Sequence, residues 1–422
     1  MAEPGSADLN RDESDRRHYE LLANEGDSEA MFALATLIES SDPAEARLWY
    51  ERAAELGNTD AAFNLALSLE DEQPVRAQEL LQSLISSGDT EAIGALARLT
   101  TKRDPETARA LFEQAAQRGD IVAVHNFANF LAPVEPERAK LLWMRAAEAG
   151  YAASMYELGN HLRTDDPAQS RHYYEQAAAG GYVQALYALG YMLEPSDPAQ
   201  SRHYYEQAAA GGYVQALYAL GYILEPSDPA QSRHYYEQAA AGGYAPALTN
   251  LGVVYRRSNR PKALHLLEEA SVLGDARAAS LLGDIYRKSD KTKARCYYAK
   301  AAELSYPAAM WQLAKMDDYC KPGSGRRYLE QAADLGYSGA LRSLGVLAIR
   351  ERDYRLAATL FDQAAQSGNK DAATVVRLLE LVQGKGVLPV LARLCLRGVT
   401  ASARFGSWFL WKLRAPVRSR KC

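Results

Sequence analysis

Four histidines are the residues whose spacing first suggests chemistry in this sequence. They stand 31 residues apart, at His172, His203, His234 and His265. Histidine is the commonest metal ligand in proteins, and the bond from zinc to a histidine nitrogen is about 2 Å long. Neighbouring helices pack about 8–10 Å apart, so equivalent histidines of successive units are too distant to share one ion. We therefore interpret all four as solvated side chains beside buried tyrosines.

No motif of a known catalytic or cofactor site stands out in the sequence. The sequence contains no P-loop, no dinucleotide-binding glycine fingerprint, no nucleophile elbow and no paired-cysteine zinc motif. The four cysteines, Cys296, Cys320, Cys395 and Cys422, show neither a 31-residue spacing nor a C-x-x-C pair. The sequence thus predicts a protein that is not an enzyme and that needs no metal or cofactor. The alternative is a hydrolase whose groups meet from distant units, and esterase or amidase activity lost on their substitution would support it.

The histidine spacing belongs to a repeat that runs through most of the chain. Residues 166–191 read DPAQSRHYYEQAAAGGYVQALYALGY, and residues 197–222 are identical. A fixed period of about 20 to 50 residues is typical of a solenoid or another open array, because a closed core offers a copied segment no equivalent place to pack. Steps of 31 residues reach Gly26, Gly57, Gly88, Gly119, Gly150, Gly181, Gly212, Gly243, Gly274 and Gly336, with Ser305 at one step and Gly368 one residue late.

Each unit is predicted to contain two helices. Asp197 is a residue type favoured at a helix N-cap, and Pro198 suits the first helical position, where a missing N–H leaves no partner unmatched. The first helix is expected to end at the glycines 211–212, since glycine adopts the left-handed conformation of a helix C-terminus without a steric penalty. In the second helix, 213–224, leucines at i, i+3 and i+7 mark one face.

Residue size alternates between two positions of the unit. The seventh residue before the repeat glycine is large: Tyr19, Tyr50, Leu81, Phe112, Trp143, Tyr174, Tyr205, Tyr236, Leu267, Tyr298 and Leu329. The fourth residue after it is small: Ala30, Ala61, Ala92, Ala123, Ser154, Ala185, Ala216, Ala247, Ala278, Ala309 and Ala340. We expect each large side chain to fit against a small one where two helix backbones approach closely.

The repeat determines the predicted domain organisation. A chain of 422 residues would ordinarily contain two or three globular domains, but no linker breaks the register between residues 11 and 383. We predict an all-α fold, an α-solenoid (superhelix) of about twelve helix-turn-helix repeats at 11–383. A disordered N-terminus at 1–10 and a basic amphipathic tail at 384–422 are expected to flank it.

The repeated residues resemble the Sel-one-like repeat family, a branch of the tetratricopeptide-like (TPR-like) helical repeats. The resemblance is carried by stretches such as ALYALGY, RHYYEQAAAGG and ARLWYERAAELG. The alanine, the leucine-glycine pair, the aromatic pair and the double alanine of the family match Ala185, Leu189, Gly190, Tyr204, Tyr205, Ala208 and Ala209. The longer Gly-x-Gly-Val loop of the family is shortened here to a turn such as EPSDP.

The resemblance implies a non-enzymatic scaffold or adaptor that binds a protein or peptide partner. In related repeats the helix with the leucine-glycine pair lines the concave groove. That implies a partner-binding set of Tyr156, Asn160, Arg163, Gln184, Tyr187, Tyr191, Gln215, Tyr218 and Tyr222. Tyrosine suits such a surface because it combines a large apolar ring with a polar tip. The alternative is that these tyrosines pack between repeats.

Charge divides the chain into two parts. The residues after Glu380 include nine basic and no acidic side chains, so against a whole-chain net charge of −5 the remainder carries −14. Because affinity for nucleic acid depends largely on lysine and arginine, an acidic solenoid argues against a nucleic-acid partner. The N-terminus lacks an apolar signal segment, and the simplest setting is the cytoplasm.

The basic tail has two interpretations. As an amphipathic helix it would contact an anionic membrane surface through Arg393, Arg397, Arg404, Trp408, Phe409 and Trp411. It would then position a membrane- or envelope-associated regulator. The alternative is a helix that caps the open end of the solenoid. Liposome flotation of the full chain beside a chain ending at Val382 separates the two, and equal flotation would remove the membrane hypothesis.

Overall fold

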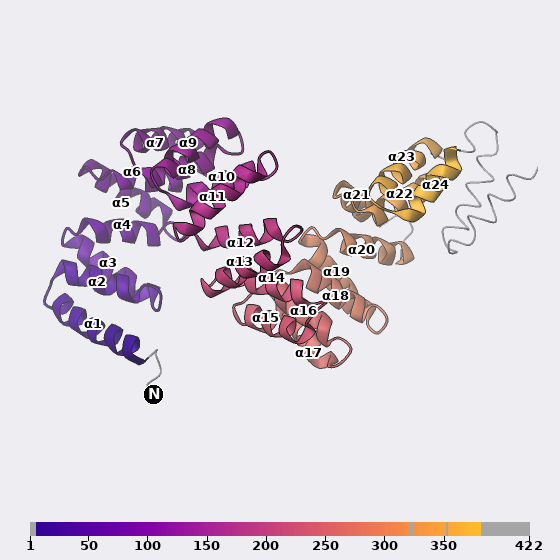
Figure 1. Cartoon of the computed structure of the whole chain (residues 1–422), viewed down its shortest axis with the longest axis horizontal. Helices are drawn as coiled ribbons and strands as arrows, with labels where there is room; N and C mark the ends of the chain where they lie inside the picture. Colours follow the sequence, from indigo (N-terminus) through magenta and orange to yellow (C-terminus); the bar gives the residue numbers. More distant parts are fainter. Residues whose placement is uncertain (1–5, 321–324, 352, 381–422) are drawn as a thin grey trace, which may run out of the picture. The chain divides into compact units, whose positions relative to one another are not determined.

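A computed structural model describes residues 6–320, 325–351 and 353–380, and all the regular structure in these ranges is α-helical (Figure 1). Contacts between helices divide the chain into two compact units, Met1–Tyr213 and Val214–Cys422. The first unit contains α1 (Ser6–Asn24), α2 (Ser28–Ile38), α3 (Pro43–Glu55), α4 (Thr59–Ser68), α5 (Pro74–Ser86), α6 (Glu91–Thr100), α7 (Pro105–Gln117), α8 (Ile121–Leu131), α9 (Pro136–Glu148), α10 (Ala152–Leu162), α11 (Pro167–Ala179), α12 (Val183–Leu193) and α13 (Pro198–Ala210). The second contains α14 (Val214–Leu224), α15 (Pro229–Ala241), α16 (Ala245–Tyr255), α17 (Arg260–Val272), α18 (Ala276–Tyr286), α19 (Lys291–Glu303), α20 (Pro307–Cys320), α21 (Arg326–Asp334), α22 (Ser338–Arg350), α23 (Tyr354–Gln366) and α24 (Lys370–Glu380).

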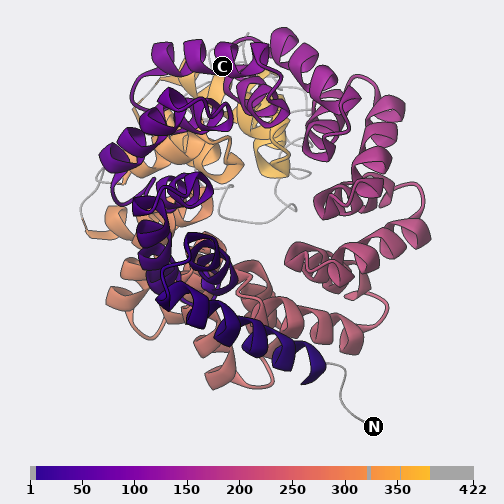
Figure 2. The ribbon, with the colours of Figure 1, turned by 90° about the vertical axis from the view of Figure 1, so that its left-hand side faces the viewer.

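The helices form an α-solenoid of twelve pairs within the described residues, which confirms the predicted fold class. Within each of the two units, each helix packs mainly against the helices before and after it in the chain. In Figures 1 and 2 the helices of the first unit, coloured from indigo to magenta, follow one another along a curved row. Neighbour-only packing of this kind is the defining property of a repeat array.

The ends of the array differ from the prediction at one point. Helix α1 begins at Ser6, so residues 6–10 are helical, whereas the sequence analysis placed a disordered segment at 1–10. Serine and aspartate near the start of this segment are residue types favoured at helix N-termini. Residues 1–5 and the tail 384–422 lie outside the described residues.

The predicted caps are confirmed in the copied unit. Helix α13 starts at Pro198, and the Asp197 carboxylate accepts a hydrogen bond of 3.0 Å from the backbone N–H of Gln200. The chain reverses at Gly212, whose φ is +83°, before α14 begins at Val214. Every other position of the predicted glycine register also has positive φ, including Ser305 at +58°. The repeat glycine therefore marks the turn between the two helices of each unit.

In six odd-numbered helices, α11, α13, α15, α17, α19 and α23, the large residue sits against a glycine of the preceding helix. The Tyr205 ring is fully buried and covers Gly190, where an added Cβ would lie 2.7 Å from two ring carbons. Tyr174 covers Gly159 in the same way and shares a buried cluster with Ala185 of α12. The predicted packing of a large residue with a small one is found for Tyr174 and Ala185, and Gly159 is a second small residue against the same ring.

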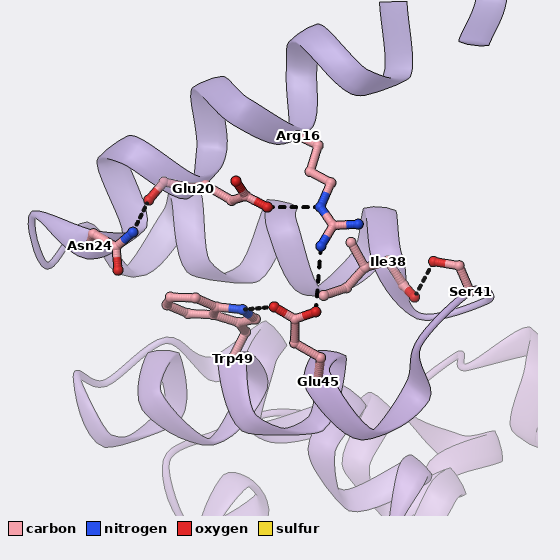
Figure 3. A network of polar contacts seen from close by, with 7 residues as sticks. All are labelled: Arg16, Glu20, Asn24, Ile38, Ser41, Glu45 and Trp49. Atoms are coloured by element: carbon pink, nitrogen blue, oxygen red, sulfur yellow. Dashed lines mark hydrogen bonds and ion pairs between the residues drawn. The ribbon is translucent and has the colours of Figure 1, made fainter.

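A network of polar side-chain contacts connects α1 with α3 (Figure 3). The Arg16 guanidinium reaches Glu20 of its own helix at 2.7 Å and Glu45 of α3 at 3.5 Å. The indole Nε1 of Trp49 donates to the Glu45 carboxylate over 3.5 Å. Because solenoid ends need a polar outer side, this network suits the position of α1 as the first helix of the array.

The contact between Gly190 and Tyr205 predicts the result of a small substitution. Gly190→Ala is expected to lower the free energy of unfolding by about 1–3 kcal/mol, because the ring must move to make room for the methyl group. Urea unfolding followed by circular dichroism measures the loss. In a Tyr205→Ala background the same change should have little effect, and an equal loss in both backgrounds would contradict the proposed contact.

Candidate partner-binding site

The even-numbered helices lie on the inner side of the curved row of helices. Even-numbered helices of successive repeats contact each other, as α6 and α8 do in the first unit and α16 and α18 in the second. Odd-numbered helices of successive repeats approach less closely within the described residues. Helices that crowd together occupy the concave side of a curve, and we therefore call the even-numbered helices the concave layer. The predicted partner-binding residues belong to α10, α12 and α14 or follow α10 directly.

Tyr156 is half-buried and packs between repeats. Its ring centroid lies 5.6 Å from that of the buried Tyr174 on α11 and 5.0 Å from that of Tyr182, the residue before α12. Tyr187 and Tyr218 make the same pair of contacts, with Tyr205 and Tyr213 and with Tyr236 and Tyr244. Three predicted tyrosines thus connect one repeat to the next and present only part of their rings to solvent.

Tyr191 and Tyr222 are far more exposed. Each stands one helical turn after the packed tyrosine of its helix, and 55% of Tyr191 and 59% of Tyr222 remain accessible. Gln184 and Gln215 lie near the start of the same helices and are half-buried. Of the predicted tyrosines, these two have the most ring surface left for a partner.

Asn160 and Arg163 have different surroundings. The Asn160 carbonyl accepts a hydrogen bond of 2.7 Å from the Tyr174 hydroxyl, and its amide donates to Glu157 over 3.1 Å. Asn160 therefore satisfies a buried tyrosine, which is a structural role. Arg163 caps the C-terminus of α10 and is exposed.

The buried tyrosine hydroxyls act as hydrogen-bond donors. The Tyr205 hydroxyl donates to Glu194 over 2.5 Å, and the Tyr298 hydroxyl donates to Asp284 over 2.7 Å. Burial raises the pKa of Tyr174 to about 12, and burial together with the Glu194 carboxylate raises the pKa of Tyr205. At neutral pH these hydroxyls stay protonated, so they supply no base or nucleophile of the kind a hydrolase requires.

Tyrosine replaces the usual cap at the start of several concave helices. Asp120 and Asp275 cap α8 and α18 through side-chain hydrogen bonds, whereas Tyr182 and Tyr244 occupy the same position without one. Loss of such a cap costs about 1 kcal/mol. The tyrosine ring instead contacts an aromatic side chain of the preceding repeat, a contact worth about 0.5–1.5 kcal/mol beyond burial. At these positions an aromatic contact between repeats takes the place of the side-chain hydrogen bond of the cap. The tyrosine also adds aromatic surface to the concave layer.

The model of the Sel1 repeat family matches nine segments of the chain. These are residues 28–58, 97–120, 145–182, 183–213, 214–244, 245–275, 276–306, 307–337 and 344–369, which together exceed half of the sequence. The chain belongs to the Sel1 repeat family. The predicted resemblance is confirmed, and proteins built from repeats of this type generally act as protein–protein interaction scaffolds.

Solved structures similar to this Sel1 repeat protein include three helical repeat proteins. One is c5321, a protective antigen of uropathogenic Escherichia coli strains with an SLR fold, at 22% identity over 96% of this chain and 99% of that chain, with a TM-score of 0.47. A Sel1 repeat protein from Oxalobacter formigenes is 21% identical over 63% and 89% of the two chains, with a TM-score of 0.46. Yeast Tom70 is 15% identical over 91% and 95%, with a TM-score of 0.49. Among curated proteins, no sequence matches the chain.

The four histidines that stand 31 residues apart lie on odd-numbered helices of the Sel1 repeats. All four are exposed: His172, His203, His234 and His265. Their exposure agrees with their interpretation as solvated side chains. No group of three or more potential ligands among histidine, cysteine, aspartate and glutamate is placed to hold a metal ion in the described part of the chain.

The predicted membrane-contact residues cannot be placed on the Sel1 repeats. Arg393, Arg397, Arg404, Trp408, Phe409 and Trp411 lie outside the described residues. Among the helices that are described, none has the length and apolar character needed to cross a bilayer. The tail therefore remains a sequence-based prediction.

A buried histidine that the sequence analysis did not single out lies between two matched Sel1 segments. His125 on α8 is 8% exposed, and its Nδ1 lies 2.8 Å from the Ser154 hydroxyl. Its Nε2 lies 3.0 Å from the amide of Asn129, and its ring centroid is 5.1 Å from that of Tyr151. His125 occupies the register position of Tyr156 and Tyr187, which is the signal that could have revealed it. Burial lowers the pKa of His125.

This lowered pKa predicts a pH dependence of stability. As pH falls below the ordinary histidine pKa of about 6.5, the unfolded chain gains a proton that folded His125 resists, so unfolding becomes more favourable. We expect the urea midpoint of the parent to fall more between pH 7.5 and pH 5.5 than that of His125→Gln. His172→Gln, which removes an exposed histidine, is the control and should behave like the parent. Equal pH differences for the parent and His125→Gln would show that His125 is not the responsible group.

Proposed function

We propose that the protein is a non-enzymatic scaffold that binds a partner protein or peptide on the concave layer of even-numbered helices. The observation that carries the proposal is the exposure of Tyr191 and Tyr222, on the concave helices α12 and α14. Each lies one turn beyond a tyrosine that is packed between repeats. Packing therefore explains one tyrosine in each helix and leaves the other without a structural role.

The chemistry of the two exposed rings supports recognition of a protein surface. Tyrosine contributes a large apolar face, a hydroxyl that hydrogen-bonds at the edge of an interface, and only a small loss of side-chain entropy. For this reason tyrosine is enriched among the residues that carry most of the binding energy at protein interfaces. The buried neighbours Tyr205 and Tyr236 hold the backbone of these helices in place. The surface is thus organised before a partner arrives, which lowers the entropy lost on binding.

The copied unit gives the surface a second property. Residues 166–191 and 197–222 are identical, so Tyr191 and Tyr222 are preceded by the same 25 residues. Two equivalent sites on one chain favour a partner that carries two copies of a short motif, because linked binding events reinforce each other through a raised effective concentration.

Alanine substitution of the two exposed tyrosines tests the proposal. Tyr191→Ala/Tyr222→Ala should leave the circular dichroism spectrum and the unfolding midpoint nearly unchanged, since exposed side chains contribute little to stability. Affinity capture from native lysate, followed by titration with the purified partner, should show at least tenfold weaker binding. The matched control is His203→Ala/His234→Ala, which removes two exposed side chains of the odd-numbered helices. Capture of the same partners by both variants would contradict a role of the tyrosines.

A further inference from the structure

Three positive side chains of the second unit come from successive concave helices. Arg287 directly follows α18, Lys315 belongs to α20 and Arg342 to α22. Arg287 and Lys315 are exposed, and Arg342 is half-buried. Partial desolvation of the Lys315 ammonium and the neighbouring charges of Arg287 and Arg342 lower the pKa of Lys315. Each arginine is thus close enough to repel Lys315, and Ser343, next to Arg342, contacts the same Trp311 ring as Lys315. We call these three cations the cationic cluster.

Aromatic side chains hold the central cation in place. The Lys315 ammonium lies 4.1 Å from the centroid of the Trp311 ring, a cation–π contact. The Trp311 indole donates to the Ser343 hydroxyl of α22 over 2.9 Å, and its ring centroid lies 6.0 Å from that of Tyr337. The orientation of Trp311, and with it the position of Lys315, is therefore supported by two further contacts.

No member of the cationic cluster forms an ion pair within the described residues. One carboxylate, that of Asp284, lies near enough to act on Lys315, and it accepts the hydrogen bond of the buried Tyr298. The odd-numbered helices contrast with this arrangement. Arg326 on α21, for example, pairs with Glu330 at 2.9 Å and with Glu351 at 2.8 Å. Arg326 thus has two carboxylate partners, whereas no member of the cationic cluster has one at ion-pair distance within the described residues.

We propose that the cationic cluster, with Trp311 and Tyr337, binds an acidic peptide segment of the partner protein in an extended conformation. The proposal rests on the scaffold function and specifies the chemistry of the partner. Carboxylates placed among Arg287, Lys315 and Arg342 relieve the repulsion between these cations and form charge-assisted hydrogen bonds with them. The rings of Trp311 and Tyr337 offer apolar surface to the aliphatic parts of the segment.

The spacing of the helices indicates the length of the segment. Adjacent packed helices lie about 8–10 Å apart, so three in a row extend over roughly 16–20 Å. An extended chain advances about 3.3 Å per residue, and five or six residues cover that distance. One acidic side chain at about every third residue would meet one cation of the cluster on each helix.

A short acidic peptide fits the cluster better than nucleic acid does. One face of the Trp311 ring is occupied by the Lys315 ammonium, which leaves it poorly placed to stack on a base. Residues 1–380 carry a net charge of −14, so a polyanion that extends beyond the cluster is repelled by the rest of the chain. A short segment confines its charge to the cluster.

Fluorescence anisotropy with labelled octaglutamate on the full chain tests the proposal. The charge-reversed variant Arg287→Glu/Lys315→Glu/Arg342→Glu is expected to bind at least tenfold more weakly than the parent. The control Arg260→Glu/Lys291→Glu/Arg327→Glu reverses three exposed cations of α17, α19 and α21 and should bind like the parent. The basic tail is identical in all three proteins, so the difference between the variants isolates the cluster. Lys315→Met, which keeps the aliphatic stem, provides a milder variant should the triple change fail to fold.

The other outcomes are equally informative. Equal affinity of the parent and both triple variants for octaglutamate overturns the proposal. It is also overturned if labelled oligothymidine, dT8, binds the parent more tightly than octaglutamate does and loses affinity in the cluster variant. Octalysine should not bind the cluster. If partner capture persists in the cluster variant and disappears in Tyr191→Ala/Tyr222→Ala, the acidic-peptide proposal fails while the scaffold function stands.

Discussion

The contact of one large side chain with a glycine of the preceding helix is the constraint on which this structure depends. Where the ring of Tyr205 covers Gly190, no side chain intervenes, and the two backbones approach as closely as the ring thickness permits. Close packing of this kind fixes both the distance between helices and their rotation about their axes. The rotation in turn directs the polar tip of Tyr205 to Glu194 and leaves Tyr191, one position from the glycine, facing outward. Fold and exposed surface thus follow from one contact.

Electrostatics distinguishes the two helix layers. The odd-numbered helices place arginines beside carboxylates, as in the contact of Arg138 with Glu113 at 2.8 Å. Exposed pairs of this type contribute little to stability, but they remove net charge from the outside. In the concave layer, tyrosine stands at several helix N-caps where other repeats have a hydrogen-bonding side chain. Arg287, which follows a helix of this layer, forms no ion pair within the described residues.

The sequence predicted the fold well because its signals are local. The turn at Gly212 and the cap at Asp197 each depend on neighbours within a few residues, and both were found where expected. The candidate site was less predictable, since its residues meet across repeats. The spacing that places Tyr156 beside Tyr182, or Lys315 beside Arg342, follows from the stacking of helices and not from any motif. The hydrogen bond that Asn160 accepts from Tyr174 is a contact of the same kind, which no motif indicates.

The identity of the copied segments has a consequence for how this protein changes over generations. The Tyr205 ring covers Gly190 in the first unit, and the Tyr236 ring covers Gly221 in the second. Each copy therefore offers the same contact surface to the repeat that follows it. Loss or gain of one whole unit of 31 residues would therefore join the same residues at the new junction. Such a change would alter the number of exposed tyrosines by one, since each copy carries Tyr191 or its counterpart Tyr222. The length of the array would change while the packing of every remaining repeat stays the same.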